Sequence, residues 1–276
     1  MRRKRKKRLK DRRRRGIYIL PNLFTAASLF CGFYAIISTI GGRYEAAAVA
    51  IFLSGILDGL DGRVARLTRS TSQFGVQFDS LSDLVAFGVA PALLSFEWAL
   101  APFGRLGWLA AFMFVVCGAL RLARFNVQKS VEDVSYFKGL PIPAAACFIA
   151  ALVLFVSFWE GDLETRSHLI LVLIYVLSFF MVSTIPYYSF KKLDLKDYKP
   201  FNVLVSIILV ALVIAYKPMV MLFFIMLLYV LSGPAITFYR LYRRSPFAKR
   251  KVGSSEEAPQ TKRVPEKEGP EPAKTP

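Results

Sequence analysis

The chain has 276 residues, is 55% hydrophobic and carries a formal net charge of +18. Its mean hydropathy of +0.44 excludes an ordinary soluble domain, and several uncharged runs reach the length of about 20 residues that a helix needs to cross a bilayer. The positive charge gathers in residues 1–15, after residue 240 and in short loops between apolar runs. That distribution is typical of cytoplasmic loops, not of a nucleic-acid-binding surface. We therefore expect a polytopic membrane protein with no nucleic-acid partner.

Taken in order, the chain divides into a transmembrane region between two charged tails. Residues 1–16 are predicted to form a basic disordered or interfacial tail, which attracts anionic lipid headgroups. The apolar run that follows is too long for a secretory signal. Residues 17–240 form the predicted transmembrane domain, and residues 241–276 are basic and then low in complexity, which is typical of disorder. The predicted spans cover residues 17–40, 46–58, 76–100, 106–125, 141–159, 169–190, 203–216 and 219–239.

The charges of the loops set the predicted topology. About eight spans place every Lys-rich loop on the same side as both termini, and the poorly basic loops on the other side. Seven spans would put the basic C-terminal tail outside. The count of eight depends on a break at Lys217-Pro218, which separates the seventh predicted span from the eighth. The sequence therefore predicts an all-α integral membrane protein, a bundle of about eight transmembrane helices with both termini in the cytoplasm.

Histidine and cysteine offer little chemistry in this chain. The three cysteines, Cys31, Cys117 and Cys147, each lie alone in an apolar run, so we expect small buried hydrophobic residues. No CxxC pair indicates a disulfide or a zinc site. The one histidine, His168, borders a polar loop. Metal or acid–base chemistry therefore has to come from carboxylates.

Four carboxylates stand in otherwise largely apolar sequence, at Asp58, Asp61, Asp79 and Asp83. Ionisable groups in membrane segments are costly and by default mark a functional site. The first two are three residues apart and the last two are four apart, so each pair shares one face of a helix. A short turn joins the second and third spans, which makes them antiparallel neighbours. We therefore expect both pairs to converge just below the cytoplasmic surface.

Convergent carboxylates suit a hard cation, Mg²⁺ or Mn²⁺, with room for two ions. Such a site also holds substrate phosphates and stabilises the charge that builds on them. Gly62, Ala65 and Gly75 are small enough to leave space for a ligand. Three arginines, Arg63, Arg66 and Arg69, are near enough to pair with phosphate oxygens. The pattern favours a diphosphate ester. The alternative, plain ion pairs with nearby arginines, stabilises a membrane bundle poorly.

The complete spacing Asp58-x2-Asp61-Gly62-x2-Ala65-Arg66-x8-Gly75-x3-Asp79-x3-Asp83 resembles the motif of the CDP-alcohol phosphatidyltransferase family, with every defining position filled. The resemblance covers about residues 17–190 and implies a core of about six helices, with the last two predicted spans outside it. Further stretches resemble the phosphatidylserine synthase branch. They are Pro21-Asn22 with Thr25, Asp79-Ser80-Leu81, Phe87-Gly88-Val89-Ala90-Pro91, Arg121 to Asn126, and Gly139-Leu140-Pro141-Ile142-Pro143.

The resemblance implies transfer of the phosphatidyl group of CDP-diacylglycerol to the hydroxyl of L-serine, giving phosphatidylserine and CMP. It implies that Asp58, Asp61 and Asp79 bind the metals. Asp83 would be shared between the metal and catalysis, as general base on the acceptor hydroxyl. Members of the family are homodimers in the cell (inner) membrane, and the active site would face the cytoplasm. The expected contacts to the CDP-lipid are Asn22, Thr25, Gly62, Ala65, Arg66, Ser72 and Gly75.

The acceptor pocket is less defined. The carboxylate of serine needs a cation, and Arg121, Arg124 and Lys138 lie at the cytoplasmic ends of the fourth and fifth spans. Their plainer role is anchoring at the membrane surface by snorkelling. Glycerol 3-phosphate or inositol phosphate is the alternative acceptor, and the same cations could bind it. A cation transporter is disfavoured because it would place acids near the bilayer midplane, and a scaffold without turnover stays open.

Overall fold

The computed structural model describes residues 2–68, 72–128, 136–159, 163–188 and 217–244. The chain divides into two compact units, Met1–Ile236 and Thr237–Pro276, and the site belongs to the first. The elements are α1 (Arg2–Ile40), α2 (Tyr44–Thr68), α3 (Gln73–Asp83), η1 (Leu84–Val89), α4 (Ala90–Ser95), η2 (Phe96–Leu100), η3 (Ala101–Phe103), α5 (Arg105–Gln128), β1 (Tyr136–Lys138), α6 (Ile142–Phe158), α7 (Leu163–Val182), β2 (Pro186–Tyr188) and α9 (Pro218–Arg244).

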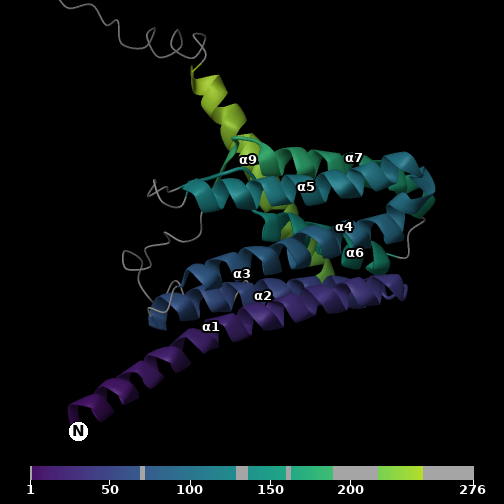
Figure 1. Cartoon of the computed structure of the whole chain (residues 1–276). Helices are drawn as coiled ribbons and strands as arrows, with labels where there is room; N and C mark the ends of the chain where they lie inside the picture. Colours follow the sequence, from purple (N-terminus) through teal and green to yellow (C-terminus); the bar gives the residue numbers. More distant parts are fainter. Residues whose placement is uncertain (1, 69–71, 129–135, 160–162, 189–216, 245–276) are drawn as a thin grey trace, which may run out of the picture. The chain divides into compact units, whose positions relative to one another are not determined.

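The described chain is mostly helical and fits the predicted all-α membrane protein. Four of its helical stretches are long and apolar enough to cross a membrane: Pro21–Ile40, Gln73–Phe103, Arg105–Val127 and Pro218–Tyr239. Two further apolar helices, Ile142–Phe158 and His168–Val182, are shorter. α2, which carries the first two aspartates of the cluster, lies beside α1 (Figure 1). The predicted span 203–216 lies outside the described residues.

Residues 2–16, predicted as a disordered or interfacial tail, are helical and continuous with the first span in α1, as the high helix propensity of Lys and Arg allows. One predicted span differs from the structure. The helix predicted over residues 169–190 ends already at Val182, so that prediction is wrong at its C-terminal end. Pro186 follows, and the residue before a proline is pushed out of helical conformation.

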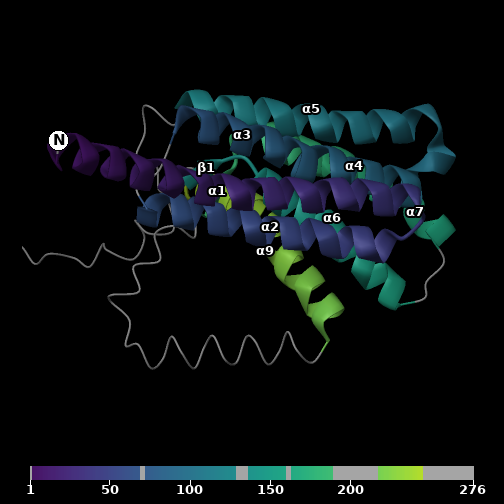
Figure 2. The same cartoon turned by 60° about the horizontal axis from the view of Figure 1, so that its bottom comes forward.

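Beyond α7 the chain forms a strand instead. β2 pairs antiparallel with β1, with Tyr136 opposite Tyr188 and Lys138 opposite Pro186 (Figure 2 labels β1). Gly139 follows β1 with φ of +86°, and a side chain there would collide with the carbonyl oxygen of Met181. This glycine therefore allows the loop before α6 to lie directly against the end of α7. A two-stranded pair of this kind was not predicted.

Small and hydroxylated residues bring the first helices close together. The hydroxyl oxygens of Ser28 in α1 and Ser54 in α2 lie 2.7 Å apart, and each hydroxyl also lies within hydrogen-bonding distance of the other residue's carbonyl oxygen. Both serines are buried. Small residues and interhelical hydrogen bonds are the usual means of helix association where water is absent. On the same helix, Gly32 lies directly against Ala86 of η1.

The third predicted span is one helical stretch built from α3, η1, α4, η2 and η3. Ser72 caps its first turn, because its side chain accepts a hydrogen bond from the amide of Gly75 at 2.9 Å. The π-helical turn η1 begins directly after Asp83. A π-helical turn holds more residues than an α-helical one, so it changes the face that later residues present, and such turns occur often at functional sites. Within this turn, Phe87 is fully buried in the core.

We expect Gly32→Ala to destabilise the protein. The new Cβ would lie 2.6 Å from the Ala86 Cα and 2.7 Å from its Cβ, so α1 would have to move away from η1. The free energy of unfolding should fall by about 1–3 kcal/mol, as in other overpacked cores. Thermal unfolding of the purified protein in detergent measures this. Gly41→Ala is the control, since its Cβ would meet nothing closer than 3.5 Å; equal unfolding temperatures for the two variants would contradict the prediction.

Candidate active site

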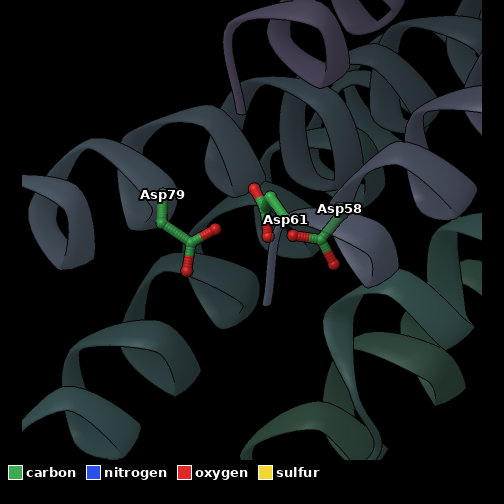
Figure 3. Close-up of side chains that lie close together, drawn as sticks. All are labelled: Asp58, Asp61 and Asp79. Atoms are coloured by element: carbon green, nitrogen blue, oxygen red, sulfur yellow. The ribbon is translucent and has the colours of Figure 1, made fainter. Parts of the chain in front are cut away.

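Three aspartates from two helices converge on one point. Asp58 and Asp61 come from α2 and Asp79 comes from α3. Each offers an oxygen atom that lies within 4.8 Å of those of the other two. Figure 3 shows the three carboxyl groups turned toward one another. The spacing within each helix and the short connection between the helices therefore bring the pairs together, as the helical phase predicts.

Thr25 ties α1 to this cluster. Its hydroxyl donates to Oδ2 of Asp61 at 2.7 Å, and the Ser82 hydroxyl of α3 donates to the Thr25 carbonyl oxygen at 3.1 Å. Thr25, Asp61 and Ser82 are all buried. A carboxylate that accepts a buried hydrogen bond is held in one orientation, which is how outer partners fix metal ligands.

Asp83 lies one helical turn beyond Asp79, and its carboxyl group is hydrogen-bonded to that of Asp58. Two carboxylates so close repel each other unless a proton or a cation lies between them. The donors in this cluster are carboxylate oxygens, which are the ligands that Mg²⁺ and Mn²⁺ prefer. The chemistry and spacing of these residues therefore fit a divalent cation.

The acids open into a cavity of about 560 Å³ between α1, α2, α3, α5 and the start of α6. A cavity of this size falls in the range of sites for small molecules and cofactors. It brings together most of the residues for which the sequence predicted a role. Those that line it are Asn22, Thr25, Asp58, Asp61, Gly62, Ala65, Ser72, Gly75, Asp79, Asp83 and Arg121.

The structure separates the cations proposed for the acceptor. Arg121 of α5 lines the cavity, is 9% exposed, and its Nε has no hydrogen-bond partner among the described residues. Arg124 is not among the described lining residues; it donates from Nη1 to the carbonyl oxygen of Val182 at 3.2 Å. A cation there stabilises the C-terminus of α7. The side chains of Arg66 and Lys138 lie outside the described residues.

Several lining residues were not predicted as site residues. The side-chain amide of Asn126 donates to the Ser80 hydroxyl at 2.8 Å, which joins α5 to α3 across the cavity. Most of the others lie in the stretches that resemble one branch of the family. The sequence therefore pointed to these stretches, but it assigned no role to their individual residues. The unpredicted lining residues are Pro21, Gly59, Val76, Ser80, Leu122, Phe125, Asn126, Pro141, Ile142 and Pro143.

Comparison with known proteins gives consistent matches. The model of the CDP-alcohol phosphatidyltransferase family matches residues 18–184. The chain is 46% identical over 179 residues to a CDP-diacylglycerol–serine O-phosphatidyltransferase of Helicobacter pylori, covering 64% of this chain and 74% of the relative. It is 35% identical over 173 residues to the protein of that name from Bacillus subtilis, covering 63% and 92%. An archaetidylserine synthase of Methanothermobacter thermautotrophicus is 36% identical over 181 residues, covering 65% and 73%.

We expect Thr25→Val to weaken divalent-cation binding. The substitution keeps the shape of the side chain but removes the hydrogen bond to Asp61, and loss of such an outer partner costs about 10–100-fold in metal affinity. Titration of Mn²⁺ followed by electron paramagnetic resonance measures the affinity. Thr39→Val is the matched control, because the Thr39 hydroxyl is also buried but is hydrogen-bonded to the Ala35 carbonyl oxygen of its own helix. An unchanged Mn²⁺ affinity in Thr25→Val would argue against the assigned role of Thr25.

Proposed function

Because the chain belongs to the CDP-alcohol phosphatidyltransferase family, we propose that it transfers the phosphatidyl group of CDP-diacylglycerol to the hydroxyl of L-serine, releasing CMP and forming phosphatidylserine. The observation that carries this proposal is the cavity that combines four carboxylates with one buried arginine. Carboxylates and a metal suit the diphosphate, and an arginine suits the carboxylate of an amino acid. The names of the relatives support serine as the acceptor.

Asp58, Asp61, Asp79 and Asp83 are the proposed ligands of one or two Mg²⁺ or Mn²⁺ ions. When bound, such an ion neutralises charge on the diphosphate and helps to orient the nucleophile. Thr25 holds Asp61 in place for this purpose. The proposed contacts to the CDP-lipid are Asn22, Thr25, Gly62, Ala65, Arg66, Ser72 and Gly75, and the small residues among them let the lipid diphosphate approach the backbone.

Asp83 is the proposed general base. It lines the cavity at its α3 wall, and it has Asp58 as an immediate neighbour. It would accept the proton of the serine hydroxyl as the oxygen attacks the lipid-side phosphorus. The bond from that phosphorus to the CMP oxygen then breaks, and CMP leaves. A general base of this kind contributes about 10²–10⁴-fold to the rate.

Arg121 is the proposed partner of the serine carboxylate. Among the lining residues that the structure describes it is the one cation, and a single guanidinium matches a singly charged carboxylate in a bidentate pair. A phosphorylated acceptor, such as glycerol 3-phosphate or inositol phosphate, carries more negative charge and would favour several cations. The same observation therefore ranks serine above the phosphorylated alcohols. A cation transporter is not favoured, because the described acids gather in one cavity that also fits a phosphate ester.

We further propose that the protein is a multi-pass homodimer of the cell (inner) membrane. About eight spans, with both termini and the active site on the cytoplasmic side, agree with the basic loops. This placement gives the lipid tails access to the bilayer, and it gives L-serine and CMP access to water. Dimerisation is supported by family membership alone.

The reaction is tested by CMP release from CDP-diacylglycerol with the purified protein. We expect release to require L-serine and a divalent cation, and to stop when a chelator is added. Asp83→Asn should lower kcat by about 10²–10⁴-fold, while Glu97→Gln, an exposed acid outside the cavity, serves as control. CMP release that depends on glycerol 3-phosphate or inositol phosphate instead of L-serine would show that the proposed acceptor is wrong. An unchanged kcat in Asp83→Asn would show that Asp83 is not the general base.

The two arginines of α5 should differ in their effects. Arg121→Ala should raise the KM for L-serine by about 10–150-fold, which corresponds to a charged hydrogen bond of about 1.5–3 kcal/mol. Arg124→Ala should leave that KM unchanged and lower the unfolding temperature, because it frees the Val182 carbonyl at the end of α7. Initial rates at varied L-serine, with thermal unfolding of both variants, separate the two roles. A raised serine KM in Arg124→Ala would contradict the separation.

A further inference from the structure

One side-chain hydrogen bond spans the cavity from α5 to α3. The amide of Asn126 donates to the Ser80 hydroxyl at 2.8 Å, and both residues line the cavity. α5 packs against η1 and α4, which follow Asp83 along the chain. Toward the start of α3 and the end of α5, the cavity lies between the two helices. Asn126 and Ser80 are both partly exposed, so a ligand in the cavity can reach them.

The Ser80 hydroxyl fixes the orientation of the Asn126 amide. It donates to the Val76 carbonyl oxygen of its own helix at 3.0 Å. A hydroxyl has one proton, so toward Asn126 it can only accept, and the amide nitrogen has to face it. The amide oxygen then lies on the other branch of the side chain, where it accepts no hydrogen bond within the part of the chain that the structure describes. This oxygen is an acceptor for a ligand.

Asn126 lies on the same face of α5 as Arg121. The residues of α5 that line the cavity are Arg121, Leu122, Phe125 and Asn126, and intervals of one, four and five residues define one stripe along a helix. Along the helix axis, the Cα atoms of Arg121 and Asn126 are about 7.5 Å apart. Two hydrogen bonds of about 2.9 Å each and the short backbone of an amino acid can bridge such an interval.

The α5 wall therefore carries a partner for each charged group of an amino acid. The Arg121 guanidinium matches a carboxylate, and the neutral amide oxygen of Asn126 accepts from an ammonium group without adding negative charge to the cavity. A carboxylate of the cluster that bound the ammonium group would no longer be available for the metal or for the proton of the hydroxyl. The proposed contacts to the CDP-lipid lie on α1, α2 and the start of α3, which leaves the α5 wall for the acceptor.

We propose that Asn126 binds the ammonium group of an amino-acid acceptor through its amide oxygen, and that Ser80 holds the amide in the orientation that this contact requires. The inference rests on the proposed function, because it takes L-serine as the acceptor and Arg121 as the partner of its carboxylate. A pocket of this kind selects an alcohol that carries both charges. Glycerol 3-phosphate and inositol phosphate have no ammonium group to fill it.

An acceptor analogue without the amino group tests the role of Asn126. 3-Hydroxypropanoate has the hydroxyl and the carboxylate of serine but no ammonium group. We expect Asn126→Ala to raise the KM for L-serine at least about 10-fold, the size of one hydrogen bond to a charged group. The inhibition constant of 3-hydroxypropanoate against L-serine should be the same in this variant as in the wild type, and the KM for CDP-diacylglycerol should not change.

Ser80→Ala tests the orienting role while the amide stays in place. This variant should raise the KM for L-serine about five-fold, the size of one ordinary hydrogen bond, and it should raise the KM no further in the Asn126→Ala background. Ser178→Ala is the matched control. The Ser178 hydroxyl also donates to the carbonyl oxygen four residues earlier, that of Ile174, at 2.8 Å, but Ser178 is not among the described lining residues. Its removal should leave the KM for L-serine unchanged.

Three results would overturn the inference while CMP release still depends on L-serine. They are an unchanged KM for L-serine in Asn126→Ala, an equal loss of affinity for L-serine and 3-hydroxypropanoate, and a rise in the KM for CDP-diacylglycerol alone. Effects of Ser80→Ala and Asn126→Ala that multiply would refute the orienting role of Ser80. If the wild type releases CMP only with an alcohol other than L-serine, the proposed function itself fails, and the inference fails with it when that alcohol has no ammonium group.

Discussion

The mutual repulsion of four carboxylates is the physical constraint that the surrounding structure has to offset. Asp58, Asp61, Asp79 and Asp83 lie on two neighbouring helices with their oxygens a few ångströms apart, in a region that is largely apolar. Such a group is stable only with hydrogen-bond donors and cations around it. Thr25 and Arg121 supply part of this compensation from α1 and α5. The divalent cation proposed for this site would complete the compensation, and it would also suit the diphosphate of the proposed substrate.

Keeping the carboxylates together depends on how closely three helical stretches approach each other. Gly32 places α1 against η1, and the reciprocal pair of Ser28 and Ser54 places α1 against α2. These contacts lie nearer the opposite ends of the helices than the acids do, so they set the angle at which the acid-bearing ends meet. Interiors packed this tightly respond to a single added methyl group, and positions far from the chemistry therefore matter for its geometry.

The sequence was most informative where local spacing decides the outcome. The i,i+3 and i,i+4 intervals placed the two aspartate pairs on facing helix sides, and the family resemblance named the carboxylates and about half of the residues that line the cavity. The sequence could not distinguish the role of Arg121 from that of Arg124. The two arginines are three residues apart on one helix, and this spacing does not indicate which side chain donates a hydrogen bond to the Val182 carbonyl oxygen. Tyr187 and β2 were missed for a related reason. A strand of three residues is fixed by its partner far along the chain and leaves no periodic pattern.

Thr25 joins three helices at a single residue, since its carbonyl accepts from α3 and its hydroxyl donates to α2. Transmembrane helices tilt to match the thickness of the bilayer around them. A tilt of α1 would therefore pull directly on Asp61, with no flexible loop between them to absorb the movement. The thickness of the surrounding lipid, and through it the lengths and saturation of the acyl chains, is thereby mechanically linked to the carboxylate cluster.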